Sequence, residues 1–131
     1  MAGHLRKLGA SKSASTLLVL FIPSVDRHSK PIAQNKWVEE ALKVLGELFG
    51  GATAFPKGRG VWRDDARGGV LVYDKPVVIQ CYTSESLLSR VAGSLKEFLV
   101  RMGKETKQGA VGLVIDRDYL EIGFSVEESE G

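Results

Sequence analysis

The sequence predicts an α+β sandwich in which two helices cover one face of an antiparallel sheet. Two stretches of helical periodicity alternate with short apolar runs, in the order strand, helix, hairpin, helix, strand. Because successive strand side chains point to opposite faces, a run that is apolar at every position is typical of a buried central strand. The chain has 131 residues, of which 44% are hydrophobic, and this is enough for one domain with its own core. The order is that of a ferredoxin-like two-layer sandwich.

The first half of the chain should contain a leader, one strand and one helix. Residues 1–15 are polar and mildly basic, so we expect a disordered leader. The run Leu17–Ile22 is apolar throughout and predicts a strand over 16–22. After a loop, Asn35 is the expected N-cap of a helix whose apolar residues recur three and four positions apart, and Gly50 should end it.

The second half should contain a hairpin, a second helix and a closing hairpin, between turns rich in Gly, Asp and Pro. The expected elements are an edge strand over 52–63, a turn over 64–69, one long or two short strands over 70–83 interrupted at 74–76, a helix from Thr83 or Ser84 to Gly103, a strand over 111–115 and a returning strand over 119–124. The domain would then span 16–126, and residues 127–131 would form an acidic tail.

Charge and cysteine content exclude several classes of protein. The 18 basic and 16 acidic residues nearly cancel, whereas a dedicated duplex-DNA binder has a larger basic excess. The single cysteine, Cys81, cannot form an internal disulfide and reads as a buried core residue. No stretch approaches the ~20 apolar residues of a membrane span. We therefore expect a cytoplasmic protein with no membrane contact and no cofactor.

The central strands predict self-association. Strands 17–22, 77–82 and 111–115 are apolar on both faces, but two helices cover only one. A second copy on the other face, forming a homodimer, is the simplest cover, and the chain's own termini are the alternative. These strands lack the aromatic platform of an RNA-recognition domain, so we expect no RNA on the sheet face, although nucleic acid elsewhere remains open.

The segment from Gly50 to Asp65 is the candidate ligand site. Its basic residues Lys57, Arg59 and Arg63 would neutralise an anionic ligand such as a phosphate, and Trp62 would stack against a base. The structural interpretation is that the glycines shape a distorted edge strand and that Trp62 fills the core. The pattern matches neither a phosphate-binding loop nor a dinucleotide fingerprint.

Asp26, His28 and Asp64 are the candidate catalytic residues. Carboxylates with one imidazole, gathered at one end of the sheet, would suit a divalent cation and a hydrolytic water. All three lie in stretches rich in turn-forming residues, where Asp commonly accepts hydrogen bonds from its own backbone. The sequence therefore predicts no definite metal site.

Short motifs give a resemblance to a known family. They are Trp37, Phe55-Pro56-x-Gly58, Trp62-Arg63, Gly69, Val77-Val78-Ile79 and Gln108-x-Ala110-Val111. On these residues the chain resembles a family of small bacterial proteins catalogued as a domain of unknown function, family three-five-seven-four. The resemblance implies the same ferredoxin-like fold and no particular activity.

Together these observations predict a non-enzymatic module, a homodimer that binds an anionic ligand or a protein partner through the segment from Gly50 to Asp65. The alternative is an enzyme. It would be either a metal-dependent phosphodiesterase that uses Asp26, His28 and Asp64, or a dimeric α+β-barrel enzyme with its pocket between sheet and helices.

Overall fold

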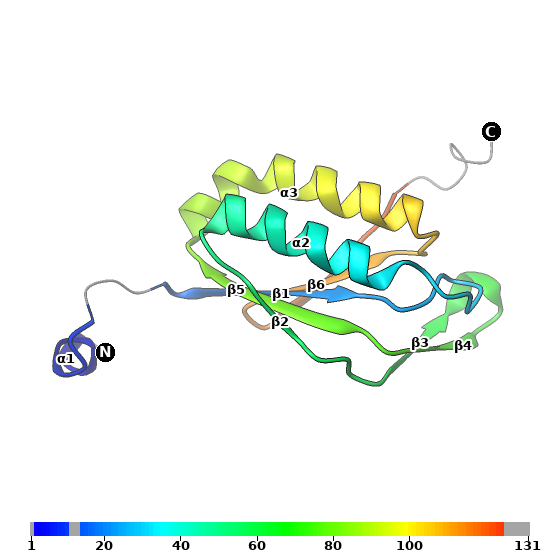
Figure 1. Cartoon of the computed structure of the whole chain (residues 1–131), viewed down its shortest axis with the longest axis horizontal. Coiled ribbons are helices and arrows are strands. Elements are labelled where there is room, and N and C mark those ends of the chain that lie inside the picture. Colours follow the sequence, from blue (N-terminus) through cyan, green and yellow to red (C-terminus); the bar gives the residue numbers. More distant parts are fainter. Residues whose placement is uncertain (1, 11–13, 125–131) are drawn as a thin grey trace.

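The computed structural model describes residues 2–10 and 14–124, and helices and sheet form two layers (Figure 1). The five-stranded antiparallel sheet has the order β2-β5-β1-β6-β7. Its strands are β1 (Thr16–Ile22), β2 (Thr53–Phe55), β5 (Val77–Thr83), β6 (Val111–Ile115) and β7 (Asp118–Ile122). Helices α2 (Gln34–Phe49) and α3 (Glu85–Glu105) cover one face, and a short helix, α1 (Ala2–Lys7), precedes β1. The predicted α+β, ferredoxin-like sandwich is confirmed.

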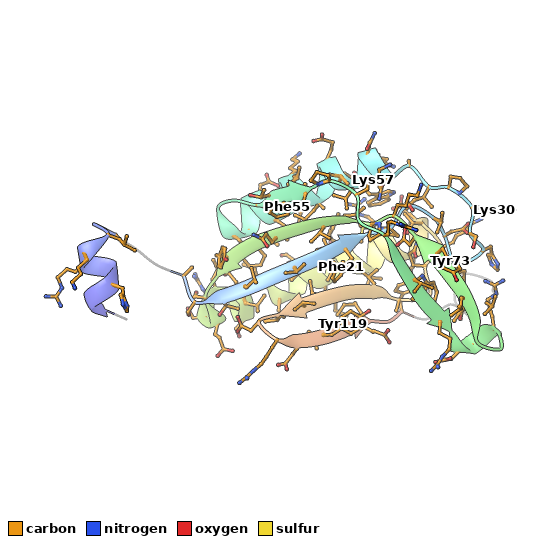
Figure 2. The ribbon with its side chains drawn as sticks, turned by 90° about the horizontal axis from the view of Figure 1, so that it is seen from below. Phe21, Lys30, Phe55, Lys57, Tyr73 and Tyr119 are labelled. Atoms are coloured by element: carbon orange, nitrogen blue, oxygen red, sulfur yellow. The ribbon has the colours of Figure 1, made fainter. Side chains whose placement is uncertain are left out.

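The hydrophobic core lies between the helices and the sheet. Leu18, Leu20 and Ile22 of β1 are fully buried, and they pack with Leu45 of α2 and Leu99 of α3. The alternate residues of β1 face the other way and are only half-buried. We call this second side of the sheet the open face, because neither α2 nor α3 covers it (Figure 2).

The helix ends follow local rules in part. Gly50 ends α2 in the left-handed conformation, with φ of 90°, and Ser84 caps α3 by accepting a hydrogen bond from the Leu87 N–H at 3.2 Å. The expected cap at Asn35 is wrong, because α2 begins at Gln34 after Ala33, which makes no side-chain cap. The expected end at Gly103 is also wrong. The helix continues to Glu105, and Gly103 leaves space for the ring of Phe124.

The predicted long hairpin is divided into two parts. Residues 53–55 join the main sheet as β2, whereas β3 (Gly60–Asp64) pairs with β4 (Val70–Asp74) in a separate two-stranded hairpin. A 3-10 turn over Asp65–Arg67 connects β3 and β4. The interruption near Asp74-Lys75-Pro76 is confirmed, because β4 ends there and β5 then returns to the main sheet. The β3–β4 hairpin therefore projects from one end of the sandwich (Figure 1).

Among the residues described, no helix combines the length and apolar character that crossing a membrane requires. The predicted acidic tail, 127–131, lies outside the described residues.

Candidate functional site

A pocket of about 460 Å³ lies where the β3–β4 hairpin meets the open face. This size is in the range of small-molecule sites. We call it the hairpin–sheet pocket. Its lining comes from β1, the loop after β1, the hairpin, the segment before β6, the start of β6, and β7. The lining residues are Phe21, Pro23, Arg27, Trp62, Arg63, Asp64, Asp65, Ala66, Asp74, Gln108, Gly109, Ala110, Val111, Gly112, Tyr119 and Glu121.

Two contacts hold the hairpin against the loop that follows β1. At the base of the hairpin, Asp74 Oδ1 accepts hydrogen bonds from the backbone N–H and the hydroxyl of Ser24, at 2.7 and 2.6 Å. Near its tip, both oxygens of Asp64 accept from Arg27 Nη2 at 3.3 Å, and Arg67 Nη1 lies 3.7 Å from Asp64 Oδ2. The β3–β4 hairpin, which forms one wall of the pocket, is therefore attached to this loop at both its base and its tip.

The inner face of the hairpin brings Trp62 to the pocket. In the β3–β4 register Trp62 is paired with Val72, which is buried, whereas Val61 and Tyr73 form an exposed pair on the opposite face. The six-membered ring of Trp62 passes Gly109, where an added Cβ would lie 3.7 Å from its Cη2 atom. This is an ordinary van der Waals distance, so the indole packs beside the backbone at Gly109.

Most charged groups of the pocket already have partners. Asp64 is paired with Arg27 and Arg67, Arg63 with Asp65 at 2.6 Å, and Asp74 accepts from Ser24. Glu121 takes part in none of the salt bridges found within residues 2–10 and 14–124. Asp74 also has no cationic partner among these salt bridges, but it accepts from Ser24, so Glu121 is the pocket carboxylate with neither a cation nor Ser24 as its partner in this part of the chain.

Tyr119 and Glu121 share the β7 side of the pocket. They lie two residues apart on the open face, opposite Val114 and Gly112 of β6. Partial burial and then the neighbouring Glu121 carboxylate raise the pKa of the Tyr119 phenol. Phe21 and Tyr119 both lie on the side of the sheet shown in Figure 2.

The structure separates the predicted ligand residues. Trp62 and Arg63 line the hairpin–sheet pocket, whereas Arg59 lines a different pocket together with Tyr73 and Lys75 at the base of the hairpin. Lys57 is exposed and lines neither pocket. Only part of the predicted set therefore comes together.

Of the three predicted catalytic residues, only Asp64 lines the hairpin–sheet pocket. Asp26 Oδ1 accepts hydrogen bonds from the backbone N–H groups of His28 and Lys30, at 2.7 and 3.0 Å. Burial by itself would raise the pKa of Asp26, but these backbone donors outweigh it and hold the pKa below 3.8. His28 does not line the pocket. Within residues 2–10 and 14–124, no three His, Cys, Asp or Glu side chains form a group that could hold a metal ion.

Sequence reasoning missed the residues that the open face contributes, namely Phe21, Gly112, Tyr119 and Glu121. Phe21 was hidden within a uniformly apolar run, in which nothing marks the outward positions. Gly112 was the available signal, because a glycine inside a strand often marks a close approach of another group.

Two solved structures share this fold over nearly their whole length. A phage SAM lyase in complex with S-methyl-5'-thioadenosine is 18% identical, with a TM-score of 0.66 over 87% of this chain and 95% of that chain. A phage SAM lyase in its apo state is 16% identical, with a TM-score of 0.64 over 88% of this chain and 94% of that chain. No protein-family model and no curated protein sequence matches this chain.

These matches correct three predictions. The resemblance to family three-five-seven-four is wrong, since no family model matches and the shared fold is that of a phage SAM lyase. The prediction of a non-enzymatic module is contradicted, because the proteins with the same fold are enzymes. The phosphodiesterase and dimeric-barrel alternatives are also contradicted, because the enzymes that share the fold are phage SAM lyases. At this level of identity the likeness establishes the fold, which is shared with a phage SAM lyase.

Proposed function

We propose that this protein is a lyase that cleaves S-adenosylmethionine and releases methylthioadenosine from the hairpin–sheet pocket. The observation that carries the proposal is the fold shared with a lyase that binds methylthioadenosine, over 87% of this chain. The composition of the pocket agrees with such a ligand. Three aromatic residues, Phe21, Trp62 and Tyr119, line it together with the carboxylate of Glu121.

The aromatic residues suit both parts of the substrate. The adenine of S-adenosylmethionine can stack on an indole or phenol ring, a contact worth about 1–3 kcal/mol per base. Its sulfonium is a cation, which aromatic faces and a carboxylate attract. Trp62 on the hairpin and Tyr119 on β7 therefore provide apolar surface, and Glu121 provides the opposite charge beside it.

The chemistry of cleavage also suits this pocket. The bond between sulfur and the amino-acid chain breaks with its electron pair going to sulfur, so that the sulfonium becomes a neutral thioether. The carbon that loses sulfur either gains a bond from the substrate's own carboxylate, which closes a lactone, or forms a double bond as the neighbouring carbon gives up a proton. Methylthioadenosine needs no proton in order to leave. Because positive charge is lost from sulfur in the transition state, a pocket that solvates the sulfonium less well than water does favours the step, whereas the attraction of the Glu121 carboxylate would contribute to substrate binding and not to the rate. The residues would thus bind and orient the substrate and exclude water.

The direct test is to incubate the purified protein with S-adenosylmethionine and to quantify both products by mass spectrometry. We expect methylthioadenosine to form as S-adenosylmethionine disappears, faster than in a protein-free control. S-adenosylhomocysteine should remain intact, because its sulfur is neutral and is a poor leaving group. The second product identifies the route: homoserine lactone indicates attack by the substrate's own carboxylate, vinylglycine indicates elimination, and homoserine indicates hydrolysis. No methylthioadenosine above the control would refute the proposal, and homoserine that forms at the initial rate, before any lactone hydrolyses, would refute its lyase character.

A pair of hairpin variants tests the location. Trp62→Ala should raise KM for S-adenosylmethionine by about 5- to 100-fold, which corresponds to the loss of one stacking contact. Tyr73→Ala is the matched control, because Tyr73 lies on the same hairpin but on its opposite face and is 69% exposed. Equal effects of the two substitutions would place the substrate elsewhere.

We also propose that the open face pairs with a second copy of the chain. Phe55 and Tyr82 on this face are 43% and 57% exposed, and the alternate residues of β1 beside them are apolar. Sedimentation equilibrium should give twice the mass of one chain, and Tyr82→Arg should give the mass of one. A monomer at high concentration would refute the pairing. The predicted cytoplasmic location would place the protein with its substrate.

A further inference from the structure

The ring of Tyr119 lies across the sheet instead of standing above its own strand. Tyr119 is paired with Val114, yet its phenol reaches diagonally to Gly112. A Cβ built on Gly112 would be 2.9 Å from Tyr119 Oη and 3.2 Å from Cε1. Real Cβ atoms do not come this close to another side chain, so the ring can occupy this place only while residue 112 is glycine.

This placement brings the phenol to Glu121. Glu121 is the register partner of Gly112, and the hydroxyl of Tyr119 lies over Gly112. The hydroxyl and the carboxylate are therefore neighbours at the edge of the hairpin–sheet pocket, which both residues line. The raised pKa of the phenol keeps its proton in place, so the hydroxyl is a donor and the carboxylate is an acceptor.

Glu121 is suited to recognise a cation because of this arrangement. Of the acidic residues in the pocket, it is the one without a cationic or Ser24 partner in the part of the chain that the structure describes. Since Glu121 is exposed, its side chain would sample several rotamers in water unless a neighbour held it. A phenol that lies over Gly112, the register partner of Glu121, stands beside this carboxylate and limits the space open to it.

We propose that Gly112 and Tyr119 are positioning residues that hold the Glu121 carboxylate where it selects the positively charged sulfur of the substrate over a neutral one. The inference rests on the proposed function, because it assigns the sulfonium to this side of the pocket. It predicts that charge selectivity depends on three residues, of which one contributes a carboxylate, one a hydroxyl and one only space.

The test compares two ligands that the enzyme cannot turn over. Sinefungin carries an amine in place of the sulfonium, and S-adenosylhomocysteine carries a neutral sulfur in the same framework. By calorimetry, the wild-type protein should bind sinefungin about fivefold more tightly, as expected for one solvated ion pair. Glu121→Gln, Tyr119→Phe and Gly112→Ala should each reduce this ratio to about twofold or less, whereas Tyr73→Phe should leave it unchanged. Tyr73 is a matched control, because it is 69% exposed and does not line the pocket, and Tyr119 is 59% exposed.

Each outcome decides the inference. If Glu121→Gln retains the wild-type ratio of the two affinities, the carboxylate does not distinguish a charged ligand from a neutral one. If Tyr119→Phe retains it while Glu121→Gln loses it, the phenol has no positioning role. Should Gly112→Ala fail to fold by circular dichroism, the other two variants still decide. Selectivity that the three substitutions lower, without methylthioadenosine formation in the wild type, would refute the proposed function and leave only the recognition of a positive charge at Glu121. Cleavage with an unchanged ratio in all variants would refute only the inference, and a wild-type protein that binds neither analogue would refute both.

Discussion

The isosteric substitution Asp64→Asn tests whether the ion pair between Asp64 and Arg27 attaches the tip of the β3–β4 hairpin to the loop after β1. Asp64 is 3% exposed and accepts from Arg27 Nη2 through both oxygens at 3.3 Å. Removing one partner of a fully buried pair costs about 3–5 kcal/mol, because the remaining charge stays buried without compensation. Arg27 would have few other acceptors if the Asp64 carboxylate were lost, because its Nε is already buried without a hydrogen-bond partner in the described residues.

The expected loss is smaller than for a fully buried pair. The side chains of Arg27 and Arg67 are 18% and 37% exposed, so water can solvate them in part, and asparagine keeps one acceptor oxygen. We therefore expect a loss of about 2 kcal/mol in the free energy of unfolding. For a domain of this size, this lowers Tm by about 8 °C, at about 4 °C per kcal/mol.

The neighbouring residue provides the control. Asp65 pairs with Arg63 at 2.6 Å, but the two side chains are 71% and 68% exposed, so Asp65→Asn should change stability by less than about 0.5 kcal/mol. Thermal and urea unfolding, followed by circular dichroism, measure both variants. Equal losses of unfolding free energy in the two variants would refute the argument that burial makes the Asp64 ion pair stabilising. A decrease in Tm of less than about 2 °C for Asp64→Asn would refute it as well.

Three further predictions concern the rest of the domain. Burial raises the pKa of the Cys81 thiol to about 11, so alkylation at pH 8 should be about 100-fold slower in the native protein than in urea, and equal rates would show that the strand is exposed. Because the pKa of Asp26 is depressed in the folded state, its contribution to stability is present above pH 3.8 and is lost as the pH falls through its folded pKa. The stability difference between wild type and Asp26→Asn should therefore shrink below pH 3.8 in urea titrations, and a constant difference would contradict this. Gly103→Ala should destabilise by about 1–3 kcal/mol, because the new Cβ would overlap the ring of Phe124. Gly93→Ala, on the same helix with nothing within 4 Å of the new Cβ, should stabilise by about 0.5–1 kcal/mol, and the same sign for both would contradict the packing argument.

The two-layer fold could be predicted from the sequence because its signals are local. The apolar run of β1 and the helical periodicities before and after the hairpin each indicate an element without reference to its partner. Gly50 and Ser84 mark helix ends by their own backbone and side-chain chemistry. The division of the predicted hairpin could not be seen, since nothing in residues 52–63 shows that β2 joins the main sheet while β3 turns away from it.

The pocket depends on contacts between residues far apart in the chain. Asp64 lies at a turn, where an acidic residue is expected to be solvated, and its partner Arg27 is 37 positions away. Phe21, Trp62 and Tyr119 come from three separate elements, and each looks like an ordinary core or strand residue by itself. Local pattern therefore shows which elements form, but not which of their outward side chains meet.

The fastening of the hairpin also determines how a small molecule would enter and leave. Ser24 and Arg27 attach its base and its tip to one loop, and Gln108 Nε2 donates to Val25 O at 2.8 Å, which ties that loop to the approach to β6. Moving the β3–β4 hairpin away from the sheet would break several of these hydrogen bonds at once, so we expect the hairpin to stay in place while a ligand enters or leaves. The way in and out is then lateral, past the rim formed by Tyr119 and Glu121, and side-chain rotation there would set the residence time.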